Sequence, residues 1–127
     1  MSDVGVALKT ILRADVDVAA LVGTRVYAFP LRQNPVLPDI TYQRVSGPRD
    51  ALLGVAKPRY QFTAWSLSYG EARAVAQAVD DCLQRYKGTS EGVLIISSIV
   101  VNDLDIYDPE TGRHTCPVDV MLKYWEE

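Results

Sequence analysis

Hydrophobic and polar residues alternate along residues 58–65, and the apolar positions are Tyr60, Phe62 and Ala64. A period of two predicts a strand with one buried face. Directly after it, Ser68 and Glu71 form a capping box, which predicts the start of a helix that we expect to end near Gly88. The apolar positions of this helix recur at helical spacing: Ala72, Val75, Ala76, Val79, Leu83 and Tyr86. This strand and this helix form the centre of the predicted fold.

The N-terminal segment predicts a small helical unit. Apolar residues at helical spacing indicate a helix over 3–13. A second, shorter helix is expected over 16–22, where Asp15 can cap its start and Gly23 can end it. Residues 24–29 follow with the character of a short strand.

Two loops surround the next predicted strand, which covers 39–45. The first, 30–38, contains three prolines, and this density of missing donors excludes a regular element. The second, 46–57, is longer than the 2–5 residues or so of an ordinary hairpin loop. It carries Leu52 and Leu53, which either contact a partner or fold back onto the domain.

The C-terminal part predicts a long hairpin. Residues 93–102 form an uncharged, β-branched run, which favours a central strand that is covered on both faces. A turn signal over 108–112 precedes a second alternating segment over 113–125. Within that segment Pro117 removes one donor, which favours an edge position or a bulge.

The order of these elements predicts an α+β fold. We expect a mainly antiparallel sheet of four to five strands, with the long helix and the N-terminal helical unit packed on it. The 127 residues suit a single domain over 1–127. No leader and no apolar stretch near the roughly 20 residues of a membrane span is visible, so we expect no membrane partner.

Charge is unevenly distributed along the chain. The formal net charge is −3, which does not indicate a nucleic-acid-binding protein. Residues 25–59 nevertheless carry six basic and two acidic residues, whereas all charged residues of 103–110 are acidic. This asymmetry indicates either charged contacts with partners or solvated loops.

Candidate catalytic and metal-binding groups are few. His114, the only histidine, shares a strand face with Cys116, but a structural zinc site needs four ligands. Asp103, Asp105 and Asp108 suggest a calcium loop, yet the sixth position is Asp108 instead of glycine and the twelfth is His114 instead of glutamate. We therefore predict no metal, no cofactor and no catalytic residue.

Several segments together resemble one family: residues 19–27, 37–46, 58–65 with 69–72, and 107–112 before the final strand. They are similar to the tail completion proteins of long-tailed bacteriophages and prophages, also called tail terminator or tail-to-head joining proteins. Pro117 departs from the pattern, because it interrupts the last strand.

The resemblance implies a structural role in the tail or neck of a virion that is assembled in the cytoplasm of a bacterial host. Such proteins form a ring, commonly a hexamer of identical copies, at the head-proximal end of the tail tube. The ring ends tube polymerisation and offers a surface to the head connector or stopper protein. DNA passes through its lumen without sequence-specific binding. The family has no catalytic residues to transfer.

Three hypotheses assign candidate interfaces to this sequence. The basic residues meet the acidic stretch of the next copy, or they line the lumen near DNA phosphates; the two leucines dock on the tail tube or the connector. The candidate residues are Arg44, Arg49, Asp50, Leu52, Leu53, Arg59, Asp103, Asp105 and Asp108. The alternative class is a small α+β ligand-binding module or enzyme of bacterial or prophage origin, which a deep pocket with convergent polar groups would support.

Overall fold

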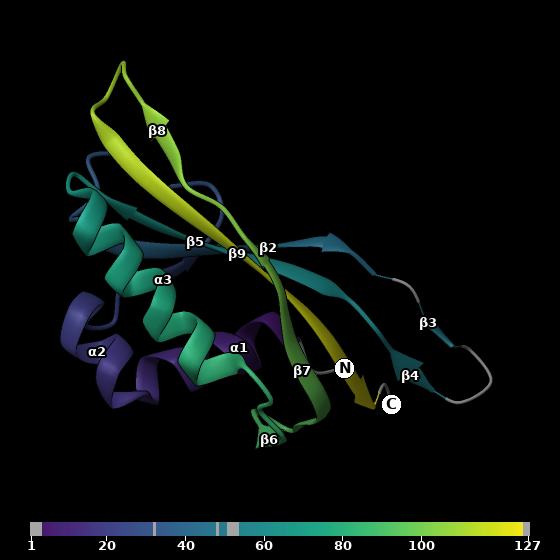
Figure 1. Cartoon of the computed structure of the whole chain (residues 1–127). Coiled ribbons are helices and arrows are strands. Elements are labelled where there is room, and N and C mark those ends of the chain that lie inside the picture. The colour runs from purple at the N-terminus through teal and green to yellow at the C-terminus, as the bar shows by residue number, and fades with distance from the viewer. Residues whose placement is uncertain (1–3, 32, 48, 51–53, 126–127) are drawn as a thin grey trace.

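The computed structural model describes residues 4–31, 33–47, 49–50 and 54–125 (Figure 1). These residues form three helices and nine strands, which confirms the α+β class with more strands than the four to five predicted. The helices are α1 (Val4–Ala14), α2 (Val16–Val22) and α3 (Tyr69–Leu83). The strands are β1 (Val26–Ala28), β2 (Asp39–Ser46), β3 (Arg49–Asp50), β4 (Val55–Ala56), β5 (Arg59–Ser66), β6 (Gly88–Ser90), β7 (Val93–Asp103), β8 (Ile106–Asp108) and β9 (Arg113–Trp125).

All described strands belong to one sheet, in which β9 is central. The order runs from β1 through β2 and β5 to β9, and β7 and β8 pair with the other side of β9. Only β1 and β2 run parallel; the remaining pairs are antiparallel, as predicted. The helices cover one face of this sheet, and α3 packs across β5 and β9 (Figure 1).

The core lies between the helices and this face. Phe62 on β5 and Val118 on β9 are fully buried and are paired across the two strands. Leu8 and Leu12 of α1 and Leu83 of α3 join the same cluster. The alternation of 58–65 and the apolar stripe of the long helix thus fold as predicted, because each puts its apolar set on one side.

Both predicted helix starts are confirmed. The Asp15 carboxylate accepts from the backbone amides of Asp17 and Val18, each at 3.0 Å. The Ser68 hydroxyl accepts from the Glu71 amide at 3.4 Å. The second half of the predicted box differs, since the Glu71 carboxylate accepts from the Ser66 hydroxyl at 2.6 Å instead of from the Ser68 amide.

The long helix ends earlier than predicted. It stops at Leu83, and Arg85 adopts a positive φ of 62° while its amide donates to the Ser98 carbonyl of β7 at 2.7 Å. The chain turns here because the backbone pairs with the sheet, and it then forms β6. Tyr86, which was predicted on the helical stripe, lies after the helix and still packs against the core.

The predicted long loop over 46–57 is partly wrong. It contains β3 and β4, which pair with each other and extend the β2–β5 hairpin beyond the helices (Figure 1). Val55 and Ala56 of β4 pair with Trp125 and Tyr124 at the end of β9. Leu52 and Leu53 lie outside the described residues.

The prediction that 93–102 is covered on both faces is wrong. β9 pairs with β7 along most of its length, but β6 pairs only with residues 93–95 on the other side. Ile99 is 50% exposed, and Leu94 and Val101 are exposed as well. A β-branched run predicts a strand, but it does not distinguish a face buried within the chain from a face left open.

Of the two positions predicted for Pro117, an edge or a bulge, the edge is wrong, because β9 has partners on both sides. The Pro117 carbonyl accepts from the Leu104 amide at 3.0 Å, and Leu104 lies between β7 and β8. The N–H and C=O of a strand residue point to the same side. The side of Pro117 on which another residue would carry its N–H group therefore faces the break between β7 and β8. No ladder bond is lost at this break among the described residues.

Candidate assembly interface

The face of the sheet without helices carries a polar line across three strands. The Arg59 guanidinium donates to the Asp119 carboxylate at 2.6 Å, and the Gln61 amide donates to its other oxygen at 3.0 Å. The Gln43 side chain extends the line to β2 by donating to Gln61 at 3.3 Å. Asp119 is buried among these partners although it lies on the open face. Arg59, a candidate for contacts with another copy, thus has a partner within its own chain.

A second charged cluster ties the acidic stretch to α3. Arg73 on α3 contacts Asp105 at 2.9 Å and Asp103 at 3.4 Å. Tyr69 donates to the Asp105 carboxylate at 3.0 Å, and the Cys116 thiol contacts its other oxygen at 3.4 Å. Desolvation is the largest single effect and raises the pKa of Asp105, but the hydrogen bonds from Tyr69, Cys116 and Arg73 together outweigh it and hold this pKa below its ordinary value.

The remaining candidate residues lie at several places. Asp108 stabilises the β8–β9 turn by accepting from the Thr111 hydroxyl and the Glu110 amide, and these bonds lower its pKa. Arg44 is exposed on β2, next to the start of the extended hairpin. Arg49 and Asp50 form β3. The structure therefore separates Arg44 and Arg59 from Asp103, Asp105 and Asp108 within one chain instead of joining them.

Exposed apolar side chains along β7, β8 and β9 were not predicted from the sequence. Ile99 on β7 pairs with Met121 on β9, and both side chains are exposed. Ile106 on β8 and Trp125 at the end of β9 are exposed as well. The signal was present for Met121 and Trp125, because they occupy the outward positions of an alternating strand. Large exposed apolar side chains on neighbouring strands, as at Ile99 and Met121, are candidates for a contact surface.

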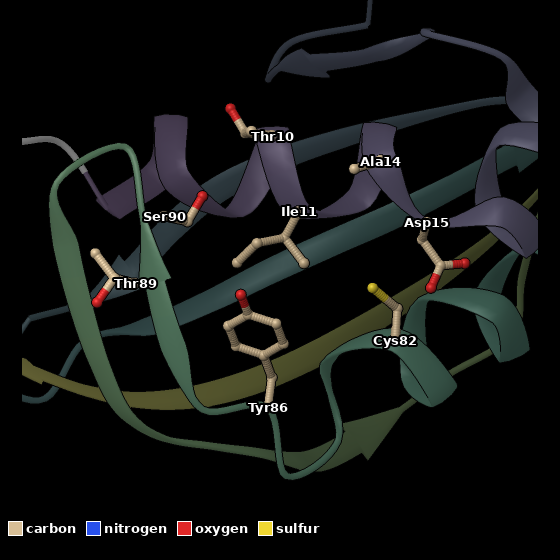
Figure 2. A pocket seen from close by; sticks show the side chains of 8 residues that line it. All are labelled: Thr10, Ile11, Ala14, Asp15, Cys82, Tyr86, Thr89 and Ser90. Atoms are coloured by element: carbon tan, nitrogen blue, oxygen red, sulfur yellow. The ribbon is translucent and has the colours of Figure 1, made fainter.

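A hollow on the helical side lies between α1, the end of α3 and β6 (Figure 2). Its volume is about 380 Å³, and its lining includes Thr10, Ile11, Asp15, Cys82 and Tyr86. Burial, with a smaller effect of Asp15, raises the pKa of Cys82 to about 12, so this thiol stays protonated and unreactive. The Asp15 carboxylate already caps α2. The hollow therefore lacks the activated groups that a catalytic pocket needs.

The ranges that the structure describes contain no group of three or more acidic, histidine or cysteine side chains that could hold a metal ion. None of their helices is long and apolar enough to cross a membrane.

Comparison with known proteins decides the family. The sequence model of the tail completion protein gp17 family matches residues 6–124. This chain belongs to that family. The tail completion protein is accordingly a structural component of a phage-type virion tail and not an enzyme. A search of curated proteins gave no match.

A solved structure has the same fold as this tail completion protein. It is a chain from the virion of a native gene transfer agent particle, with a TM-score of 0.77 and 18% sequence identity. The alignment covers 94% of the present chain and 92% of that chain. The two proteins therefore share nearly their whole architecture despite their distant sequences.

Proposed function

We propose that this protein acts as a single domain that caps the head-proximal end of the tail tube as a ring. This ring is a hexamer of identical copies. The ring ends tube polymerisation and joins the tail to the connector or stopper protein of the head. DNA passes through its lumen without sequence-specific contacts. The observation that carries this proposal, beside the family, is the exposed apolar surface of β7, β8 and β9, which a lone copy leaves in water.

Capping is tested with purified protein and tail tubes assembled from the matching tube protein. Light scattering gives the mass of the free protein, and negative-stain electron microscopy shows the tube ends. We expect one end of each tube to carry a ring and tube growth from that end to stop. A protein that stays monomeric and leaves tube length unchanged would contradict the proposal.

Contacts to the tail tube or the connector are assigned to the segment between β3 and β4, which includes Leu52 and Leu53. The support is the position of the β3–β4 hairpin, which extends beyond the helices (Figure 1). Replacing both leucines with serine should leave the melting temperature unchanged and abolish joining. Infectious particles formed with this variant would remove the assignment.

The basic candidates have two possible partners, the next copy or DNA in the lumen. The separation of basic and acidic segments within the chain favours the next copy. In that case Arg49→Glu weakens the ring. If the basic residues face DNA instead, Arg49→Glu leaves the ring intact and lowers the salt-dependent retention of DNA in the particle.

A further inference from the structure

We propose that neighbouring copies contact each other through opposite edges of the sheet, so that the acidic edge of one copy meets the basic edge of the next. The acidic edge comprises the exposed apolar residues of 99–106 with the carboxylates of 103–110. The basic edge comprises β1, β2 and their connection, with Arg25 and Arg44. This inference rests on the proposed ring and adds the surfaces that form it.

The two edges lie at opposite ends of the sheet (Figure 1). The strands β5 and β9 separate β2 from β7. With about 4.8 Å between neighbouring strands, β2 and β7 are roughly 14 Å apart. The two edges therefore cannot cover each other within one chain, whereas a second copy can reach both.

Each edge exposes its own set of large apolar side chains. On the acidic edge these are Ile99 (50%), Val101 (44%), Leu104 (48%) and Ile106 (51%). On the basic edge they are Phe29 (48%), Val36 (66%) and Val45 (53%). Apolar residues of this size at the centre of a contact, with charges at its rim, are typical of subunit interfaces.

Both edges also end in strand segments without a partner. β1 pairs only with residues 40–42 of β2, and within the described ranges no strand follows β2 further on that side. On β7 the outer side is paired with β6 at 93–95. Farther along, the Ser98 carbonyl accepts from the Arg85 amide and the Val100 amide donates to the Gln84 side chain, and no strand pairs with this side beyond residue 95 in the described ranges. Open strand edges of this kind pair with other chains unless they are protected.

The charges of the two edges are complementary. Asp103 and Asp105 contact Arg73, yet about half of each side chain remains exposed and available for a second cation. Asp108 and Glu110 add negative charge at the same edge. On the basic edge Arg44 is exposed, and Arg25 is held over the connection by its bond to the Pro38 carbonyl at 2.9 Å.

A contact between two different surfaces of identical copies is heterologous, and repetition of one rotation closes it into a ring. A contact of one edge with the same edge of another copy would stop at a dimer and would bring carboxylates together. The pairing of unlike edges thus satisfies the apolar side chains, the open strands and the charges in one arrangement.

Complementary variants test the pairing. The acidic-edge variant carries Ile99→Asp and Ile106→Asp, and the basic-edge variant carries Val36→Asp and Val45→Asp. The matched control is Val16→Asp on α2, which is 81% exposed and lies outside both edges. All changes are at exposed positions, and circular dichroism with thermal unfolding verifies that each variant folds.

Sedimentation velocity of the variants gives the decisive result. We expect each edge variant alone to associate at least about a hundredfold more weakly than the wild type. An equimolar mixture should form a one-to-one dimer that grows no further, because only one intact contact remains. The control should behave as the wild type. An edge variant that still forms full rings, or a mixture that forms no dimer, would overturn the proposal.

Cross-linking on capped tubes tests the contact in the assembled state. The native cysteines are first removed by Cys82→Ala and Cys116→Ala. In that background a chain with Val45→Cys and Ile99→Cys, treated with a reagent shorter than about 10 Å, should give a ladder of linked copies. A chain with only one of the two new cysteines should remain unlinked. The span between strands given above prevents linkage within one copy. Capped tubes without a ladder would overturn the edge contact alone. A protein that neither oligomerises nor caps tubes would overturn both this inference and the proposed function.

Discussion

Apolar side chains are buried on one face of β9 and exposed on the other. On the helical face Cys116, Val118, Val120 and Leu122 are at most 2% exposed, whereas Met121 and Trp125 on the open face are 40% and 48% exposed. One strand thus serves two purposes through its alternation. The helical face stabilises the fold of a single copy, and the open face keeps apolar area for contacts that a single copy does not make.

The largest expected effect lies on the helical face. Phe62→Ala removes a fully buried ring from the centre of the core and leaves a cavity, so we expect a loss of about 3–5 kcal/mol in the free energy of unfolding. Urea denaturation followed by fluorescence measures it. Ile99→Ala on the open face is the matched control, with a loss below about 1 kcal/mol. Equal losses in the two variants would contradict the division between the faces.

The polar line on the open face gives the next largest effect. Asp119→Ala removes the acceptor of Arg59 and of Gln61, so we expect a loss of about 1–3 kcal/mol. Arg59 is one-third exposed and can turn to water, which favours the lower part of that range.

A double-mutant cycle with Arg59→Met separates the ion pair from the loss of packing. The coupling should be measurable, since the two groups are 2.6 Å apart. A stability of Asp119→Ala equal to that of the wild type would show that this line does not join the three strands energetically.

Periodicity predicted the helical face well and the open face poorly. The alternation of 58–65 and the stripe from Ala72 to Leu83 depend on burial within the chain, so both were predictable from sequence. Whether both faces of the run 93–102 are covered depends on which elements pack above and below the sheet there, which is a tertiary property. The same holds for Asp103 and Asp105, because the sequence does not reveal that Arg73 lies 30 and 32 positions away at contact distance.

The β3–β4 hairpin and Pro117 show the limits of local rules. Prolines, glycines and charged residues made 46–57 resemble a loop, yet pairing with the end of β9 orders Val55 and Ala56 as a strand. Pro117 by itself indicates an edge or a bulge, and the break between β7 and β8 accommodates it in a central strand. In both cases a distant partner decides the local structure.

A smaller effect is expected from pH at the acidic cluster. Because the folded state lowers the pKa of Asp105, this group stabilises the fold above the carboxyl pKa of the unfolded chain, near 3.9, and the contribution is lost as pH falls through the folded value. Asp105→Asn should therefore be less stable than the wild type at pH 6, and the difference should shrink below about pH 4. Thermal unfolding from pH 6 to pH 2 measures it. A difference that stays constant over this range would mean that the charge of Asp105 does not contribute.

The smallest effect on stability is expected where the effect on assembly is large. Ile99 and Met121 face each other across β7 and β9 on the open face. Replacing both with threonine keeps a strand-forming residue at each position and leaves no cavity, so the free energy of unfolding should change by less than about 0.5 kcal/mol. Tube capping should nevertheless weaken, because the apolar contact is lost. If this variant instead unfolded as readily as Phe62→Ala, the open face would belong to the folding core and not to the assembly.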